Sequence, residues 1–240
     1  MRDSEQASLS ATDNLETKIV AWTPTGLFGG DLWGRTSDGG NHVLFGIDAP
    51  FTSDTQLVSP VLDASPTEPL VVTLKHAFSL EAVPEVEVFF DGGVIEVSND
   101  GGATWRDVTE VGVDPGYSGT ILPDFGNPLG GREGFSGTNA SFPQLETLTL
   151  NFGTQFAGTG VQLRFRLGTD ECCSAAGWEI DDIAVTGITN TPFPGFVPEP
   201  TKCFAATTQS ARTTEQSGVV GVRTMPHASL NGVGGVTPNL

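Results

Sequence analysis

The chain has 240 residues, including 31 glycines and 16 prolines, and 17% of its residues are charged. Its 29 acidic and 11 basic residues leave a formal net charge of −18, which argues against nucleic acid as a partner, because phosphate neutralisation needs clustered lysine and arginine. No stretch approaches the ~18 consecutive apolar residues of a membrane span. The composition favours one large domain of many short strands, with or without a tail.

The first twelve residues are polar, and we expect a flexible N-terminus over 1–12. Its opening, Met1–Glu5, has no apolar run and is not a signal peptide. We therefore expect a secreted form of this chain to begin after the cleavage point or to be cut from a longer precursor.

From residue 13 to 190, apolar stretches alternate with turns, which predicts a β-sandwich of antiparallel strands. Along residues 161–167 apolar and polar side chains alternate, so Arg164 and Arg166 are expected to face outward from a sheet with one wet face. The stretches are 17–22, 42–47, 55–62, 70–80, 86–90, 94–98, 145–152 and 161–167.

Two segments lack such a pattern. Residues 114–141 are rich in Gly, Pro, Asn and Ser and predict a long exposed loop, in which Tyr117, Phe125 and Phe135 are candidate ligand contacts. Residues 191–240 are rich in Pro, Thr and Gly and predict a tail or linker.

Motifs for catalysis do not emerge. The three histidines, His42, His76 and His227, form no His-Glu-x-x-His arrangement, and no Gly-x-Ser-x-Gly elbow is present. Ser98–Trp105 fits the Asp-box of sialidase propellers, but one copy is better interpreted as a structural hairpin. Carboxylate pairs for glycoside hydrolysis cannot be singled out from the sequence.

The three cysteines are Cys172, Cys173 and Cys203. Adjacent cysteines rarely pair with each other, so one of the first two could pair with Cys203, which would leave an odd thiol.

The stretch Gly177–Val185 reads Gly-Trp-Glu-Ile-Asp-Asp-Ile-Ala-Val and is apolar on both faces. At least one of Asp181 and Asp182 must therefore face packed surroundings, where a carboxylate needs a hydrogen-bonding partner or a metal ion. Calcium is slightly favoured over backbone or arginine partners, because the chain has so few cations.

That stretch resembles the last strand of jelly-roll domains of the MAM type, and other segments agree in order: Asn14–Glu16 with Trp22, Leu57–Pro60, His76–Phe78 and Asp91–Val97. The chain is also similar, over about residues 13–200, to the C-terminal β-sandwich of secreted myxobacterial proteins that carry fungalysin-type metallopeptidases. The segments that carry this similarity are 116–121, 127–132, 135–137, 164–170 and 177–194.

The resemblance implies an all-β jelly roll of two antiparallel sheets, secretion to the extracellular space, and a structural calcium ion held by Glu16 and Asp181. Asp48 and Asp91 are added as calcium ligands on chemical grounds only. The stretch 81–90 and the pair Cys172–Cys173 depart from the expected pattern. The peptidase domain and its zinc motif are absent from this chain.

We therefore expect no enzyme, but a calcium-stabilised accessory or adhesive module that contacts a glycan, a matrix component or a cell-surface protein. One alternative is an assembly subunit whose tail adds a strand to a neighbouring copy in a homo-oligomer. A hydrolase with its own carboxylate site is the least favoured alternative.

Overall fold

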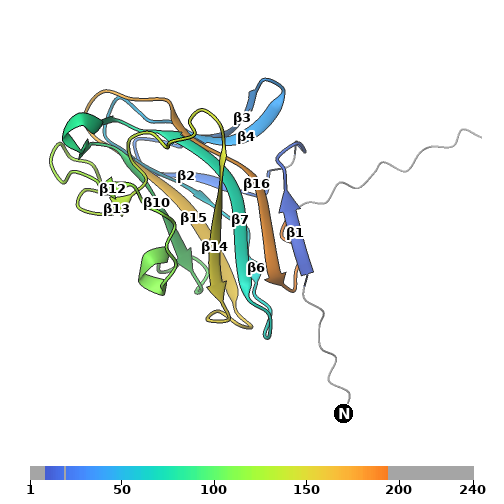
Figure 1. The fold of residues 1–240 in the computed structure, drawn as a ribbon. Helices are drawn as coiled ribbons and strands as arrows, with labels where there is room; N and C mark the ends of the chain where they lie inside the picture. Colours follow the sequence, from blue (N-terminus) through green and yellow to red (C-terminus); the bar gives the residue numbers. More distant parts are fainter. Residues whose placement is uncertain (1–8, 19, 194–240) are drawn as a thin grey trace, which may run out of the picture. The chain divides into compact units, whose positions relative to one another are not determined.

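The protein is a two-layer sandwich in which every pairing between the named strands is antiparallel. The computed structural model describes residues 9–18 and 20–193. Figure 1 shows β14, β7 and β16 side by side in one layer and β10 and β15 in the other. The predicted fold class is therefore confirmed.

The first sheet follows the order β14 (Glu146–Gly153), β7 (Leu70–Ser79), β16 (Gly177–Ile188), β4 (Asn41–Gly46) and β3 (Trp33–Asp38), with β1 (Leu9–Asp13) also paired to β16. The second sheet follows the order β11 (Arg106–Asp107), β10 (Gly92–Ser98), β15 (Gly160–Thr169), β5 (Ser53–Val58) and β2 (Thr23–Phe28), with β6 (Leu62–Asp63) also paired to β15.

Short elements connect these strands. The smaller strands form two separate ladders, β8 (Ala82–Val83) with β9 (Val88–Phe89) and β12 (Gly119–Thr120) with β13 (Glu133–Gly134). Two single-turn 3₁₀ helices are η1 (Pro84–Val86) and η2 (Val108–Val111). No helix among the described residues is long and apolar enough to cross a membrane.

The core between the sheets is built around Trp178 of β16, which is fully buried. Its ring lies 5.7 Å from those of Trp33 and Phe165 and 5.4 Å from that of Phe135, centroid to centroid, all in edge-to-face geometry. Aromatic pairs prefer this geometry because the positive ring edge meets the negative face. The apolar side chains that alternate along the predicted strands thus pack into this core.

Segment 114–141 differs from the predicted open loop. It folds into the β12–β13 ladder and packs on the outer face of β10, where Ile121 and Leu129 bury Val94. Arg132 in the same segment bonds Glu96 of β10 at 2.8 Å. The prediction failed because these apolar residues are spaced irregularly among glycines and prolines.

Other sequence predictions need correction at the N-terminal end. The opening strand is β1, which lies before Asn14, whereas Asn14–Trp22 forms no strand among the residues described there. The sandwich thus extends into the predicted flexible N-terminus of residues 1–12. The strands β2 and β3 were not predicted, because proline and glycine interrupt their alternation. The tail predicted for 191–240 lies, from residue 194 onward, outside the described residues.

Candidate functional site

Of the three side chains that were candidate ligand contacts, one is exposed, one is partly buried and one is buried. Phe135 is 2% exposed and belongs to the aromatic core, and the Tyr117 hydroxyl is held inside by Asp107 and the backbone of Ile95. Phe125 is 53% exposed. Phe135 cannot meet a ligand and Tyr117 is fixed by its hydrogen bonds, so Phe125 is the exposed ring that segment 114–141 offers.

Two further phenylalanines join Phe125 at one end of the second sheet. Phe28, at the end of β2, is 61% exposed, and Phe51, just before β5, is 44% exposed. We call Phe28, Phe51 and Phe125 the phenylalanine rim. Single exposed apolar residues are ordinary on protein surfaces, whereas a group of aromatic rings at one edge marks a candidate contact surface.

The backbone next to each of the three phenylalanines lies beside the short segment Thr52–Ser53. Phe51 precedes it directly, and Phe28 precedes Gly29, where an added Cβ would lie 2.8 Å from the Cβ of Ser53. Phe125 precedes Gly126, where an added Cβ would lie 3.8 Å from the Thr52 hydroxyl oxygen. The rim therefore joins three segments that are distant in sequence.

The two calcium ligands expected from the resemblance have other partners. Glu16 is half-exposed and accepts hydrogen bonds from the backbone N–H and Nδ1 of His42, at 2.9 and 2.8 Å. Asp181 is 3% exposed, and its two oxygens accept from Asn41 Nδ2 and the Asp182 amide. No group of three close metal-ligating side chains among the described residues contains Glu16 or Asp181.

The acidic residue that shares the surroundings of Asp181 is Asp13 at the end of β1. Asp13 is buried, one of its oxygens accepts from the Leu15 amide, and the other, Oδ2, has no partner. Burial, and to a smaller extent the charge of Asp181, raises the pKa of Asp13. The sequence does not single out Asp13, because it directly follows the segment predicted to be flexible and no alternating pattern around it indicates a strand.

Asp48 and Asp91, by contrast, come together at the rim end of the sandwich. Asp48 is 3% exposed, and its Oδ2 accepts from the amides of Glu81 and Ala175 at 3.0 and 2.7 Å. Asp91 is fully buried, and its Oδ1 accepts from the Asp170 amide at 2.7 Å. The other oxygen of each, Asp48 Oδ1 and Asp91 Oδ2, is buried without a partner.

Glu81 and Asp170 complete this group, which we call the carboxylate cluster: Asp48, Glu81, Asp91 and Asp170. Ligand oxygens of Glu81, Asp91 and Asp170 all lie within 4.8 Å of one another. Asp170 is 3% exposed, and Glu81 Oε2 is a third buried oxygen without a partner. Sequence analysis missed both residues, because nothing in the chain marks positions 81 and 170 as neighbours.

The pKa values within the cluster respond to burial and to like charge. Burial raises the pKa of Asp91, and the neighbouring carboxylate of Asp48 adds to the rise. Burial also raises the pKa of Asp48 and of Glu81, and the charge of Asp170 acts in the same direction on both. Without a cation, the cluster must therefore retain protons in order to limit repulsion.

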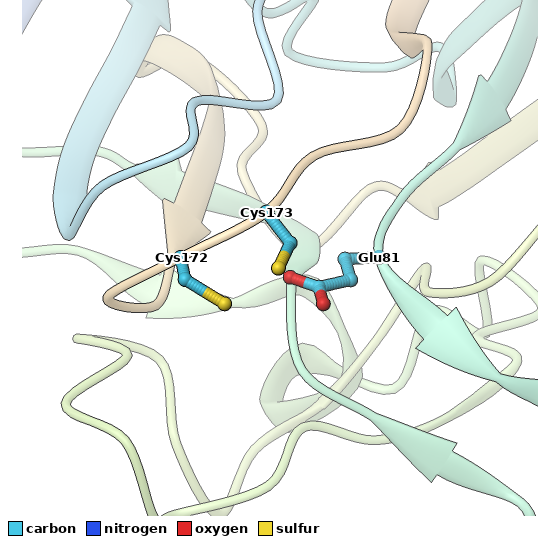
Figure 2. A group of neighbouring side chains, drawn as sticks. All are labelled: Glu81, Cys172 and Cys173. Carbon is cyan, nitrogen blue, oxygen red and sulfur yellow. The ribbon is translucent and has the colours of Figure 1, made fainter.

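Glu81 also faces two thiols. Figure 2 shows the Cys173 sulfur directed at the Glu81 carboxylate, with Cys172 beside it. Glu81, Cys172 and Cys173 form a second group of metal-ligating atoms within 4.8 Å of one another, and both thiols are exposed and free. The proposed partner Cys203 lies outside the described residues.

The described histidines and the Asp-box have structural partners. His76 is 3% exposed, its Nδ1 accepts from Trp178 Nε1, and burial lowers its pKa to about 4, so it is neutral at pH 7. Within the Asp-box, Asp100 accepts from the Thr104 amide at 2.9 Å and from the Ser98 hydroxyl at 2.7 Å. The hairpin interpretation of that motif agrees with this geometry.

No family model matches the chain, and no curated protein matches it. The predicted link to MAM-type domains and to metallopeptidase-associated sandwiches therefore stays a prediction.

Solved structures with a similar arrangement include adhesin and carbohydrate-binding domains. The K1 cleaved adhesin domain of Lys-gingipain from Porphyromonas gingivalis W83 is 12% identical, with a TM-score of 0.41, over 74% of this chain and 97% of that one. The module TmCBM61, solved with β-1,4-galactotriose, is 11% identical, with a TM-score of 0.37, over 68% and 86%. Similarity this low carries no argument about function, which must come from the residues themselves.

Proposed function

We propose that the chain is a non-catalytic binding module of a secreted protein and that its phenylalanine rim contacts the ligand. The observation that carries the proposal is the group of three exposed rings, Phe28, Phe51 and Phe125, beside Thr52–Ser53 at one end of a rigid sandwich. Exposed aromatic rings on a preformed scaffold supply contact area at low entropic cost.

The ligand that suits this surface best is a neutral glycan. The net charge of −18 repels acidic polymers, and aromatic faces can pack against the apolar faces of sugar rings. The described histidines support a non-catalytic role, because His76 is buried under Trp178 and His42 is paired with Glu16. The proposed secretion rests on the sequence resemblance alone.

The experiment is glycan binding by the full chain and by Phe51→Ala and Phe125→Ala. Removing a central aromatic contact is expected to weaken affinity about tenfold or more. Val61→Ala is a matched control, because Val61 is 43% exposed but lies beyond the opposite end of β5. Absence of binding across a broad array of neutral glycans, or equal binding by the rim variants, would refute this function.

The alternative of assembly through the C-terminal tail falls on residues outside the described part. It predicts that deleting the chain after Pro200 changes the oligomeric state. A hydrolase is less well supported, because the Asp48 and Asp91 carboxylates are 3% and 0% exposed and cannot reach a polymer.

A further inference from the structure

Buried acids on the second sheet are paired with arginine, whereas the carboxylate cluster has no basic partner among the described residues. On the second sheet, Glu96 bonds Arg164 and Arg132, and Asp54 bonds Arg166. No ion pair within the described residues involves a member of the cluster. Four acidic groups thus meet where residues 9–18 and 20–193 supply no paired positive charge.

The acidity of the cluster is one indication of a bound ligand, and its unpartnered oxygens are a second, independent indication. Asp91 is 0% and Asp48 is 3% exposed, yet each has one oxygen fixed by backbone amides and one without a partner. Buried polar atoms in native proteins nearly always have a partner, so these oxygens, with Glu81 Oε2, indicate a missing one. A proton shared between Asp48 and Asp91 would give a partner to those two carboxyl groups alone, whereas a bound cation would also serve Glu81 and would offset the negative charge.

The spacing of the oxygens suits a hard divalent cation. Ca²⁺ binds oxygen at about 2.3–2.6 Å, so ligand atoms on opposite sides of one ion lie about 5 Å apart. The oxygens of Glu81, Asp91 and Asp170 lie within 4.8 Å of one another. Calcium suits irregular carboxylate sets in extracellular modules, whereas Mg²⁺ demands near-ideal octahedral geometry.

We propose that Asp48, Glu81, Asp91 and Asp170 form a calcium site, and that the bound ion fastens together the segments that carry the phenylalanine rim. The ion site stands on its own, whereas its effect on the rim rests on the proposed function. The site is distinct from the Glu16–Asp181 pair, where all four carboxylate oxygens already have partners.

Hydrogen bonds connect the cluster to the rim directly. Thr169, next to Asp170, donates to the Phe51 carbonyl at 2.7 Å and bonds the Ser53 hydroxyl. Asn127, two residues after Phe125, donates to the carbonyls of Phe90 and Gly168 at 2.7 and 2.9 Å. The ring of Phe90, beside Asp91, meets that of Phe125 edge to face at 5.9 Å.

The test is thermal melting and calorimetric titration of the full chain, first in EDTA and then in millimolar calcium at constant ionic strength. Calcium is expected to raise the melting temperature by several degrees and to bind with measurable heat. Magnesium at the same concentration is expected to give a smaller rise, and an equal rise would overturn the choice of calcium. Absence of both heat and shift with calcium would overturn the site.

Asp91→Asn separates a metal ligand from a merely structural residue. The amide keeps the carbonyl oxygen that accepts from Asp170 and places a donor beside Asp48, so its stability in EDTA should equal or exceed that of the parent. Its calcium response should be lost. Glu81→Gln, at a half-buried position, is the second variant and should also lose the response. Full responses in both variants would overturn the assignment.

Controls locate the ion and separate it from the thiols. Asp181→Asn and the double variant Cys172→Ser/Cys173→Ser should keep the calcium response, because calcium binds at the cluster and takes oxygen rather than sulfur ligands. A response lost only in Asp181→Asn would place the ion between β1 and β16 and overturn the proposal.

The rim variants distinguish this proposal from the proposed function. Phe125→Ala should keep the calcium shift, and glycan affinity in the parent should fall when EDTA replaces calcium. A calcium shift without any glycan binding would refute the module's function and leave the ion site intact. Glycan binding that is unchanged in EDTA would refute the coupling to the rim.

Discussion

At the scale of single residues, the fold treats its buried acids in two ways. Glu96, on the outer face of β10, is 4% exposed and is held by Arg164 and by Arg132 at 2.8 Å. Burial pushes its pKa up, but the hydrogen bond and charge of Arg164 and the charge of Arg132 outweigh burial, so the pKa lies below its usual value. The carboxylate cluster has burial without arginine, and the pKa values of Asp48, Glu81 and Asp91 lie above their usual values.

We expect Glu96→Gln to cost about 3 kcal/mol of unfolding free energy at pH 7, because a buried guanidinium loses its charged partner while Gln56 still bonds Arg164. A lowered folded-state pKa stabilises the fold above the unfolded pKa, and that contribution is lost as pH falls through the folded value. The difference in unfolding free energy between the parent and Glu96→Gln should therefore become smaller below about pH 4. Urea unfolding at a series of pH values measures it, and a gap that stays constant would contradict the argument.

At the scale of elements, one edge of β16 pairs with two different strands in turn, β4 and then β1, while its other edge pairs with β7. β16 pairs with β4 up to Ile180 and with β1 from Ile183, and its register against β7 shifts between Asp181 and Ala184. Asp182 has a positive φ of 45° at this bulge. The shift turns Asp182 outward to Lys75, at 2.9 Å, whereas strict alternation along the strand would place it on the same face as Trp178 and Ile180.

The difference between regular strands and irregular features such as this bulge explains how much of the fold could be predicted from the sequence. Regular alternation predicted β7, β14 and β15 to within about a residue at most ends. It also required one buried aspartate in β16, and Asp181 is that residue. Bulges, short ladders and the β12–β13 cover depend on contacts between distant segments, so no local period indicates them.

Ile121 tests whether segment 114–141 belongs to the fold. Its side chain is fully buried against Val94 and Leu129. We expect Ile121→Ala to lower the unfolding free energy by about 3 kcal/mol, since it removes buried methylenes and leaves a cavity. Val86→Ala, at a side chain that is 65% exposed, should change it by less than about 0.5 kcal/mol. Equal effects in chemical unfolding would mean that the segment is an independent loop.

At the scale of the whole molecule, the candidate site is assembled from positions that lie far apart in the chain. Asp48 follows β4, Glu81 and Asp91 flank the β8–β9 ladder, and Asp170 follows β15. Chemical reasoning could select Asp48 and Asp91 as oxygen ligands, but their meeting with Glu81 and Asp170 depends on how the sandwich closes. The rim was predicted only at Phe125, because exposure at Phe28 and Phe51 depends on the same closure.

The net charge of −18 gives the folded state a general self-repulsion besides the local repulsion within the cluster. Raising the ionic strength from about 0.01 to about 0.1 M shortens the Debye length from about 30 to about 10 Å, which screens exposed charges but hardly reaches buried ones. Sodium chloride should therefore raise the melting temperature of the parent and of Asp91→Asn by the same few degrees, in EDTA. Calcium at matched ionic strength should add a further rise in the parent alone.

A melting temperature that falls with salt would mean that the exposed parts of ion pairs such as Arg166–Asp54 outweigh the general repulsion. A salt response as different between the two proteins as the calcium response would mean that the cluster is open to solvent, since only exposed charges are screened in this range.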